Sequence, residues 1–88
     1  MRRDIFQALA DPTRRALLHL LATQSMTPNA LAAHFDITRQ AVSKHLRILA
    51  ESRLVQSSRR GRELYYQLLP KKLSELDQWL DPFRSQWR

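Results

Sequence analysis

The sequence predicts a small, mainly α-helical domain with one β-hairpin, in the element order α-α-α-α-β-β-α. Three observations support this fold class. Apolar residues recur at helical spacing up to Ser52. The apolar period then changes from about 3.6 to 2, over two short runs on either side of the chain's one glycine, Gly61. Helical spacing returns after Pro70 and continues to Trp87.

Length and composition indicate a single globular domain spanning residues 1–88. The chain is 43% hydrophobic, and a protein of this size buries only about 60–65% of its unfolded surface, so a partner subunit would add stability. It has no cysteine, which excludes disulfides, thiolate metal sites and thiol redox switches. No apolar run reaches the roughly 18–20 residues that span a bilayer, and the start, MRRDIFQALA, is too short for a signal peptide. We therefore expect a cytoplasmic protein without a membrane partner.

The first two helices are predicted from apolar spacing and a capping signal. Residues 2–10 form the first. Asp11 and Pro12 then supply an N-cap and a proline at the first helical position of the second, which runs to about Thr23. Three apolar residues share one side of the first helix, Ile5, Phe6 and Leu9, and the buried stripe predicted for the second is Ala16, Leu17, Leu20 and Leu21.

Two further helices are joined by a tight turn. After the connector 24–26, Thr27-Pro28 repeats the cap-plus-proline signal and opens a short helix over 28–35, whose Leu31 and Phe35 would pack inward. Asp36-Ile37 forms the turn, and Thr38 caps the next helix, 38–50.

The β-hairpin comes next. Residues 54–58 and 63–68 alternate as strands do, and Arg59-Arg60-Gly61-Arg62 connects them, with Gly61 where a hairpin needs a positive φ. Of the neighbouring Tyr65 and Tyr66, one should face the core and the other the surface.

The last helix is predicted over 71–87. Asp81-Pro82 interrupts it, either as a kink or as a cap and a fresh start. Its apolar stripe has spacings of 3 and 4, and comprises Leu73, Leu76, Leu80, Phe83 and Trp87.

Helix 38–50, TRQAVSKHLRILA, separates into two faces when wound at about 100° per residue. One face is apolar with a single histidine: Ala41, Val42, His45, Leu46, Ile48 and Leu49. The other is polar and has no acid: Arg39, Gln40, Ser43, Lys44 and Arg47. These polar side chains are of the kinds that hydrogen-bond guanine, adenine and phosphate. The alternative is an ordinary solvated face, although such faces usually mix Glu with Lys, and here Glu51 stands only at the far end.

The charge distribution also favours a nucleic acid. The chain has 15 basic and 8 acidic residues, a net charge of +7. Seven of the basic residues lie between positions 39 and 62, where Glu51 is the one acid. Two helices joined by a tight turn, the second of them basic, followed by a basic hairpin, form a winged helix-turn-helix.

The predicted partner is double-stranded DNA. Recognition helix 38–50 would enter the major groove, and the wing, 58–63, would lie on the minor groove or the backbone. The predicted contacts are Thr38, Arg39, Gln40, Ser43, Lys44 and Arg47 from the helix and Arg59, Arg60 and Arg62 from the wing. Two alternatives stay open: Thr38 serves only as an N-cap, and the wing is merely a solubilising turn.

Other basic side chains have weaker assignments. Arg14 and Arg15 could touch the DNA backbone, although Arg14 could equally form a salt bridge to Asp11 or Asp36. We expect His45 to be packed in the core. His19 and His34 lack a histidine four residues away, so neither is expected to bind a metal.

Three segments, ALADPTRRALLHLL, LAAHFDITRQAVSKHLRIL and SRLVQSSRRGRELYYQL, together resemble the ArsR family of bacterial winged-helix repressors. The tail, KKLSELDQWLDPFRSQW, is similar to a subgroup often encoded beside START-like proteins. The resemblance implies a repressor of its own or a neighbouring operon that binds a palindromic operator as a homodimer. It also places Gln40, Ser43 and Lys44 at the family positions that face the major groove.

The resemblance implies a dimer interface between the first and last helices, 2–10 and 71–87. The apolar content of these helices agrees, since it exceeds what one small core can bury: Ile5, Phe6, Leu9, Leu73, Leu76, Trp79, Leu80, Phe83 and Trp87. The alternative is that the two tryptophans simply close the core of the monomer.

Metal sensing is not expected. The founding members of the family sense metals through cysteines on the helix before the recognition helix, and here that stretch, TPNALAAHF, has none. Other members use His and acidic pairs on the last helix, and here that helix has no histidine. We therefore expect a non-metal-sensing subgroup, no metal or other cofactor, and no identifiable inducer.

Two other function classes were weighed. A protein-interaction module could use the same scaffold, since fold does not fix function. An enzyme is not expected: there is no glycine-rich phosphate loop, and Ser43 and His45 point about 160° apart on their helix, so they cannot form a catalytic dyad.

Overall fold

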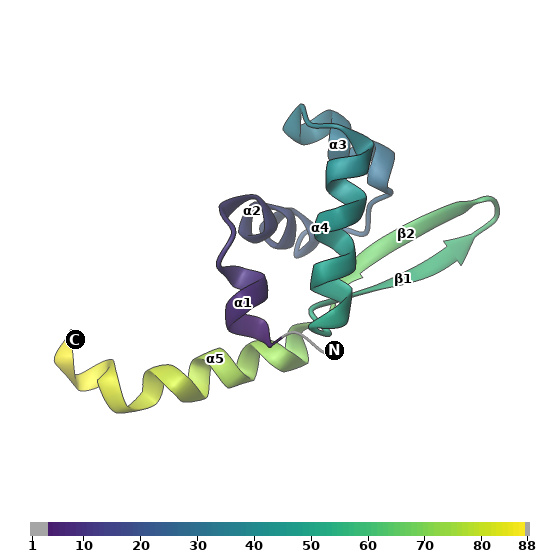
Figure 1. The fold of residues 1–88 in the computed structure, drawn as a ribbon. Helices are drawn as coiled ribbons and strands as arrows, with labels where there is room; N and C mark the ends of the chain where they lie inside the picture. Colours follow the sequence, from purple (N-terminus) through teal and green to yellow (C-terminus); the bar gives the residue numbers. More distant parts are fainter. Residues whose placement is uncertain (1–3, 88) are drawn as a thin grey trace.

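The computed structural model describes residues 4–87 and has the predicted element order (Figure 1). The elements are α1 (Ile5–Leu9), α2 (Pro12–Leu21), α3 (Pro28–Phe35), α4 (Arg39–Glu51), β1 (Val55–Arg60), β2 (Glu63–Leu68), a 3-10 turn (Pro70–Lys72), α5 (Leu73–Leu80) and a 3-10 segment (Asp81–Gln86). This is the winged helix-turn-helix that the sequence predicts.

A side-chain N-cap begins each of the first four helices, three of them at the predicted residue and α1 at Asp4. Asp4 accepts a hydrogen bond from the Gln7 N–H at 2.8 Å, and Asp11 accepts one from the Arg14 N–H at 3.0 Å. The predicted caps Thr27 and Thr38 likewise accept from the backbone N–H three residues on, each at 3.1 Å. Residues 2 and 3 of the predicted first helix lie outside the described residues.

The second helix differs from its prediction in length and in its buried side. It ends at Leu21, two residues before Thr23. Its fully buried residues are Leu17, Leu18 and Leu21, whereas the predicted Ala16 and Leu20 are only half-buried. The reason is that α1, α4 and β2 all pack against α2. A helix that packs against several elements can bury residues outside the stripe that faces one partner, and Leu18 is such a residue.

The turn between α3 and α4 is tight because Asp36 adopts the left-handed conformation, with φ 54°. Asp and Asn tolerate this region better than other non-glycine residues do. Within α3, Leu31 is buried and Phe35 is partly buried against the core, as expected.

The hairpin has a longer ladder than predicted. Its antiparallel pairing runs from Val55↔Leu68 to Arg60↔Glu63, so the connection is two residues, Gly61 and Arg62, and not four. Gly61 has φ +62°, which permits a two-residue turn that matches the strand twist and lets pairing continue to the tip. The prediction that the first strand begins at residue 54 and ends at 58 is therefore wrong at both ends.

Tyr65 and Tyr66 divide between the two faces of the hairpin, as predicted. Tyr66 packs against the core and exchanges two backbone hydrogen bonds with Met26, at 3.1 and 2.8 Å. Tyr65 lies on the other face, with the Arg60 guanidinium carbon 4.6 Å from its ring centre. That distance allows a cation–π contact.

The last helix is interrupted where the sequence signalled. α5 ends at Leu80, and the chain continues in 3-10 turns to Gln86, so a single helix over 71–87 is wrong. Pro82 lacks an N–H, and its ring would clash with a carbonyl in the preceding α-helical turn. Asp81 makes no side-chain cap, which leaves the kink as the correct alternative.

The core is formed by α1 to α4 and the start of β1, without a fully buried residue from α5. Its members are Ile5, Ala8, Leu17, Leu18, Leu21, Leu31, Val42, Leu46, Leu49, Leu54 and Val55. Trp79 and Trp87 are 55% and 54% exposed, so the alternative in which the tryptophans close the monomer core is wrong.

Candidate nucleic-acid interface

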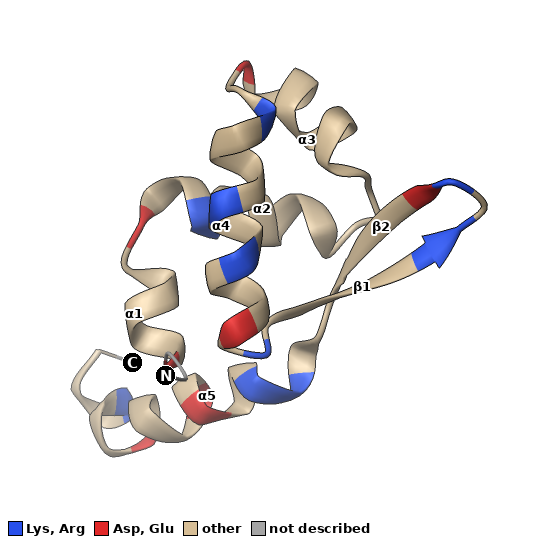
Figure 2. Cartoon of the chain, turned by 45° about the vertical axis from the view of Figure 1, so that its right-hand side comes forward, with Lys and Arg blue, Asp and Glu red and all other residues tan. Residues whose placement is uncertain are grey.

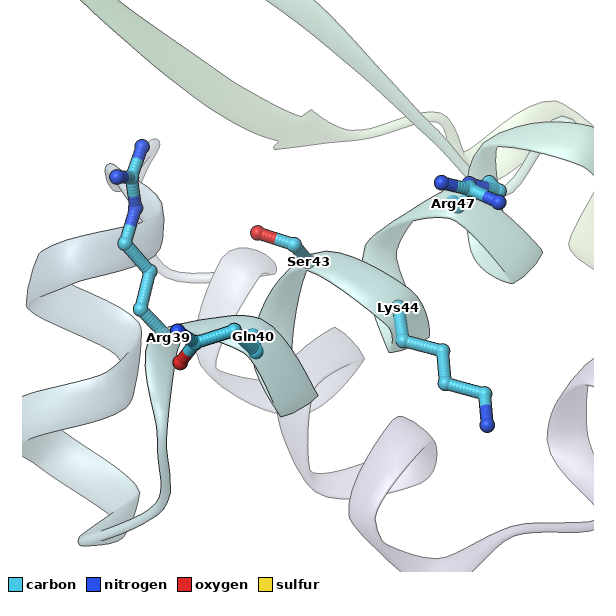
Figure 3. A pocket seen from close by; sticks show the side chains of 5 residues that line it. All are labelled: Arg39, Gln40, Ser43, Lys44 and Arg47. Atoms are coloured by element: carbon cyan, nitrogen blue, oxygen red, sulfur yellow. The ribbon is translucent and has the colours of Figure 1, made fainter.

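Helix α4 is fixed to the core by one face and presents the other to solvent. Val42, Leu46 and Leu49 are fully buried beneath it. The five polar residues of the opposite face are exposed and line an open depression of about 450 Å³, from which their side chains fan outward (Figure 3): Arg39, Gln40, Ser43, Lys44 and Arg47. The structure thus brings together all five residues that the helical wheel grouped.

The cations on this face have no partner among the described residues. The side chains of Arg39, Lys44 and Arg47 make no hydrogen bond or ion pair with any residue between 4 and 87. Their donors are therefore available to an external acceptor. Thr38 stands at the head of the helix, where its hydroxyl accepts the hydrogen bond from the Ala41 N–H.

The wing and α4 meet in one cleft. A volume of about 380 Å³ is lined by Arg39 and Ser43 from α4 and by Arg59 and Arg62 from the hairpin. Basic segments accordingly lie both along α4 and at the wing tip in Figure 2. Arg60 differs from its neighbours because it lies against Tyr65 on the other face of the hairpin. The three wing arginines are therefore divided between the two sides of the wing.

The sequence did not indicate that the start of α3 belongs to this cleft. Thr27, Pro28 and Asn29 line it, opposite the wing. The first N–H groups of a helix lack intrahelical partners and carry partial positive charge. The local pattern of Thr27-Pro28 indicates a cap, and nothing in it places this segment beside residues some thirty positions later.

Arg14 and Arg15 have structural partners at the end of α1. Arg14 donates from Nε to the Ala8 carbonyl at 2.7 Å and from Nη2 to the Gln7 carbonyl at 3.1 Å. Arg15 donates from Nη1 to the Leu9 carbonyl at 2.7 Å. These bonds supply donors to the last carbonyls of the short helix α1, of which that of Gln7 also accepts from the Ala10 N–H at 3.2 Å.

His45 is half-buried on the core side of α4, close to the start of α2. Its Nδ1 lies 3.9 Å from Asp11 Oδ2 and 3.5 Å from Arg14 Nη1. The hydrogen bond from the Arg14 backbone N–H lowers the pKa of the Asp11 carboxyl below its ordinary value. The charges of His45 and Arg14 add to this effect, and burial opposes it.

The remaining histidines form no site. His19 and His34 are exposed, and residues 4–87 contain no group of three or more His, Cys, Asp or Glu side chains that could hold a metal ion. Nor does any helix in the described chain have the length and apolarity to cross a membrane.

The apolar residues of the two terminal helices divide into buried and exposed sets. Ile5 is only 2% exposed and belongs to the core, which corrects its predicted place on an intersubunit face. Four residues in this set are only partly buried: Leu9, Leu73, Leu76 and Leu80. The exposed members are aromatic: Phe6, Trp79, Phe83 and Trp87.

Three of these aromatic rings form a chain of contacts where α1 packs on α5 (Figure 1): Phe6 on α1, Trp79 on α5 and Phe83 in the 3-10 segment that follows. The ring centres of Phe6 and Trp79 are 5.9 Å apart, and those of Trp79 and Phe83 are 5.0 Å apart. The four exposed aromatic residues, Phe6, Trp79, Phe83 and Trp87, are called the aromatic face below.

Comparison with known proteins agrees with this arrangement. Residues 9–57 match the helix-turn-helix domain family. The transcriptional repressor SdpR of Bacillus subtilis (strain 168) is 36% identical over 77 residues, which cover 88% of this chain and 86% of SdpR.

Two solved structures show the same fold. The crystal structure of a possible transcriptional regulator for arsenical resistance has a TM-score of 0.82 and 44% identity, covering 92% of this chain and 84% of its own. The homodimeric winged helix-turn-helix DNA-binding domain of Mb0332 from Mycobacterium bovis, a possible ArsR-family regulator, has a TM-score of 0.75 and 24% identity. This match covers 94% of this chain and 77% of the Mb0332 chain, and it shows a likeness of fold.

Proposed function

Because this chain belongs to the ArsR family of helix-turn-helix transcriptional regulators, which are not enzymes, we propose that it represses transcription as a homodimer bound to a palindromic operator. DNA-binding regulation is the function of the family. The name of SdpR supports the repressor role, and the homodimeric Mb0332 domain supports the twofold assembly. The target would be its own operon or a neighbouring one.

The observation that carries the proposal is the convergence of α4, the wing and the start of α3 on one cleft that holds Arg39, Arg59 and Arg62. A major groove about 12 Å wide admits a helix such as α4. With α4 in that groove, the sugar–phosphate strand at its edge would lie in the cleft, between Arg39 on one side and the wing on the other. The Asn29 N–H in the first turn of α3, where Thr27 takes the N–H groups of Ala30 and Leu31, would add a neutral donor to the same strand.

Individual roles follow from the chemistry of each side chain. Gln40 can pair with adenine, and Lys44 and Arg47 can pair with guanine or hold a phosphate. Thr38 and the N–H groups at the start of α4 would face a phosphate. Arg59 and Arg62 would hold the backbone beside the wing, while Arg60, on the far face, would reach toward the minor groove.

We assign the dimer interface to the aromatic face, with the partly buried leucines of α1 and α5 behind it. Exposed aromatic rings of this size are unusual on a monomer unless they bind something. A twofold axis through this face would place two α4 helices in successive major grooves, about 34 Å apart, which requires a palindromic site.

Metal-independent binding is part of the proposal. Within residues 4–87 no cluster of ligating side chains supports a sensor site, in contrast to what the resemblance implies for founding members of the family. We assign the chain to a non-metal-sensing subgroup, such as that encoded beside START-like proteins. It would act where bacterial DNA lies, in the cytoplasm.

The test is selection of bound sequences from a random duplex pool, carried out once with divalent metals and once with a chelator. A palindrome with half-sites about one helical turn apart, recovered equally in both, is expected. If no sequence is enriched, the basic face serves non-specific or protein contacts, and a protein-interaction module becomes the better account. Enrichment only with metal would contradict the subgroup assignment.

A further inference from the structure

A second concave site lies along α2 and shares no lining residue with either depression beside α4. It has a volume of about 190 Å³, and four leucines form its apolar walls: Leu9, Leu18, Leu68 and Leu73. These residues come from α1, α2, β2 and α5, so the pocket sits where the terminal helices join the DNA-binding frame. An apolar cavity of about 150 Å³ is large enough to bind benzene, so this one can hold a hydrocarbon part of roughly seven or eight heavy atoms.

The polar lining of the pocket is one arginine and one histidine. Arg15 and His19 stand one turn apart on α2, and both are exposed. Within the described residues the Arg15 side chain makes one hydrogen bond, from Nη1 to the Leu9 carbonyl, and no ion pair. The rest of its guanidinium therefore stands at the pocket without a carboxylate partner.

From this combination we infer that the pocket binds a small, mainly apolar carboxylate, such as a medium-chain acyl or aromatic acid. The leucine walls would bury the hydrocarbon part, and Arg15 would pair with the carboxylate at the surface. A neutral apolar ligand would leave Arg15 unused, and a small inorganic anion would gain nothing from the four leucines. The inference rests on the geometry of one protomer and adds a ligand to the proposed regulator.

The pocket borders both functional parts of the molecule. Leu9 and Leu73 belong to the elements assigned to the dimer, whereas Leu18 and Leu68 belong to α2 and the wing strand. A bound ligand would therefore contact both parts at their junction and bias the spacing of the two recognition helices.

The experiment uses the full chain with octanoate as the probe, and 1-octanol as its neutral counterpart. Binding is measured by calorimetry and by amide chemical shifts. We expect saturable octanoate binding with a Kd of about 0.1–1 mM, with shifts centred on Arg15, His19 and Leu68. Octanol should bind at least about tenfold more weakly, because it cannot pair with the guanidinium.

Two variants and one control locate the site. Arg15→Gln should weaken octanoate binding about tenfold. Ala22→Leu, at an exposed position that lines the pocket, should remove binding by filling the space without touching Arg15. Arg53→Gln removes an equal charge from an exposed residue outside the pocket and should leave binding unchanged. Thermal unfolding checks that each variant is folded.

Several outcomes would overturn the inference. One is that octanoate binding does not saturate up to about 10 mM, and another is that octanol binds as tightly as octanoate. A third is that octanoate binding persists in both variants, which would indicate adsorption to the aromatic face. Binding that weakens as protein concentration rises would mean that a second copy covers the pocket. Operator binding is measured on the same samples without octanoate. Its retention when octanoate fails to bind would contradict this inference alone, and its absence would contradict the proposed function.

Discussion

The polar face of α4 makes a quantitative prediction for the double variant Lys44→Ala/Arg47→Ala. Both side chains are exposed, and neither bonds another described residue, so their loss breaks no internal interaction. Alanine also favours the helix slightly. Each charge-assisted hydrogen bond to a base edge or a phosphate contributes about 1.5–3 kcal/mol, less where water competes. We therefore expect operator binding to weaken by about 2–4 kcal/mol for each protomer, or about 30- to 1000-fold at each half-site.

The assay is fluorescence anisotropy with a labelled operator duplex, at one fixed salt concentration. The matched control, Lys71→Ala/Lys72→Ala, removes the same net charge from the 3-10 turn before α5, outside both α4 depressions. Its affinity should stay within about threefold of the parent chain. Unchanged affinity in the α4 variant would refute the recognition-helix assignment. An equal loss in the control would show that only net charge matters.

Three further predictions concern the wing, the dimer and the cap of α2. The logarithm of operator affinity should fall linearly with the logarithm of salt concentration, and Arg59→Gln/Arg62→Gln should reduce that slope by up to about 2 for each protomer; an unchanged slope would place both arginines off the backbone. Phe83→Asp should shift sedimentation toward monomer, because burying a ring that is 44% exposed contributes about 2 kcal/mol per protomer; an undisturbed dimer would move the interface elsewhere. Asp11→Ala should lower the free energy of unfolding by about 1 kcal/mol through the lost N-cap. Because the folded-state pKa of Asp11 lies below its ordinary 3.8, this contribution is present above that pH and is lost as the pH falls through the lower value. Urea unfolding of the two proteins should therefore converge in acid, and a constant gap would contradict the cap account.

Features set by neighbouring residues were predictable from the sequence. The caps at Asp11, Thr27 and Thr38 act over three residues, and each begins a helix where the local pattern places it. The two faces of α4 depend only on helical period, which is why buried Leu46 and exposed Lys44 were both assigned correctly.

Features that depend on distant packing were not predictable. Leu18 is buried because α1, α4 and β2 surround α2, which no spacing rule within α2 reveals. Ile5 packs into the core, whereas its neighbour Phe6 remains exposed. Arg14 and Arg15 bond carbonyls of the preceding helix, although their sequence pattern equally suggested DNA contacts.

The cleft between α4, the wing and the start of α3 is the clearest feature that the sequence alone did not predict. Local patterns identified α4 and the wing separately, but the place of Asn29 beside Arg59 follows from how α3 packs against β2. The division of the wing arginines also required the strand register, because it is the pairing of Arg60 with Glu63 that sets which side chains share a face.

The most direct test of the central claim is an amide chemical-shift titration of the isotopically labelled chain with its selected operator duplex. Shifts should concentrate on the polar side of α4 and on both walls of the cleft, with Asn29 and Arg59 among the most affected and the Trp79 indole N–H nearly unchanged. Shifts centred on α1 and α5, with α4 and the wing unaffected, would contradict the account.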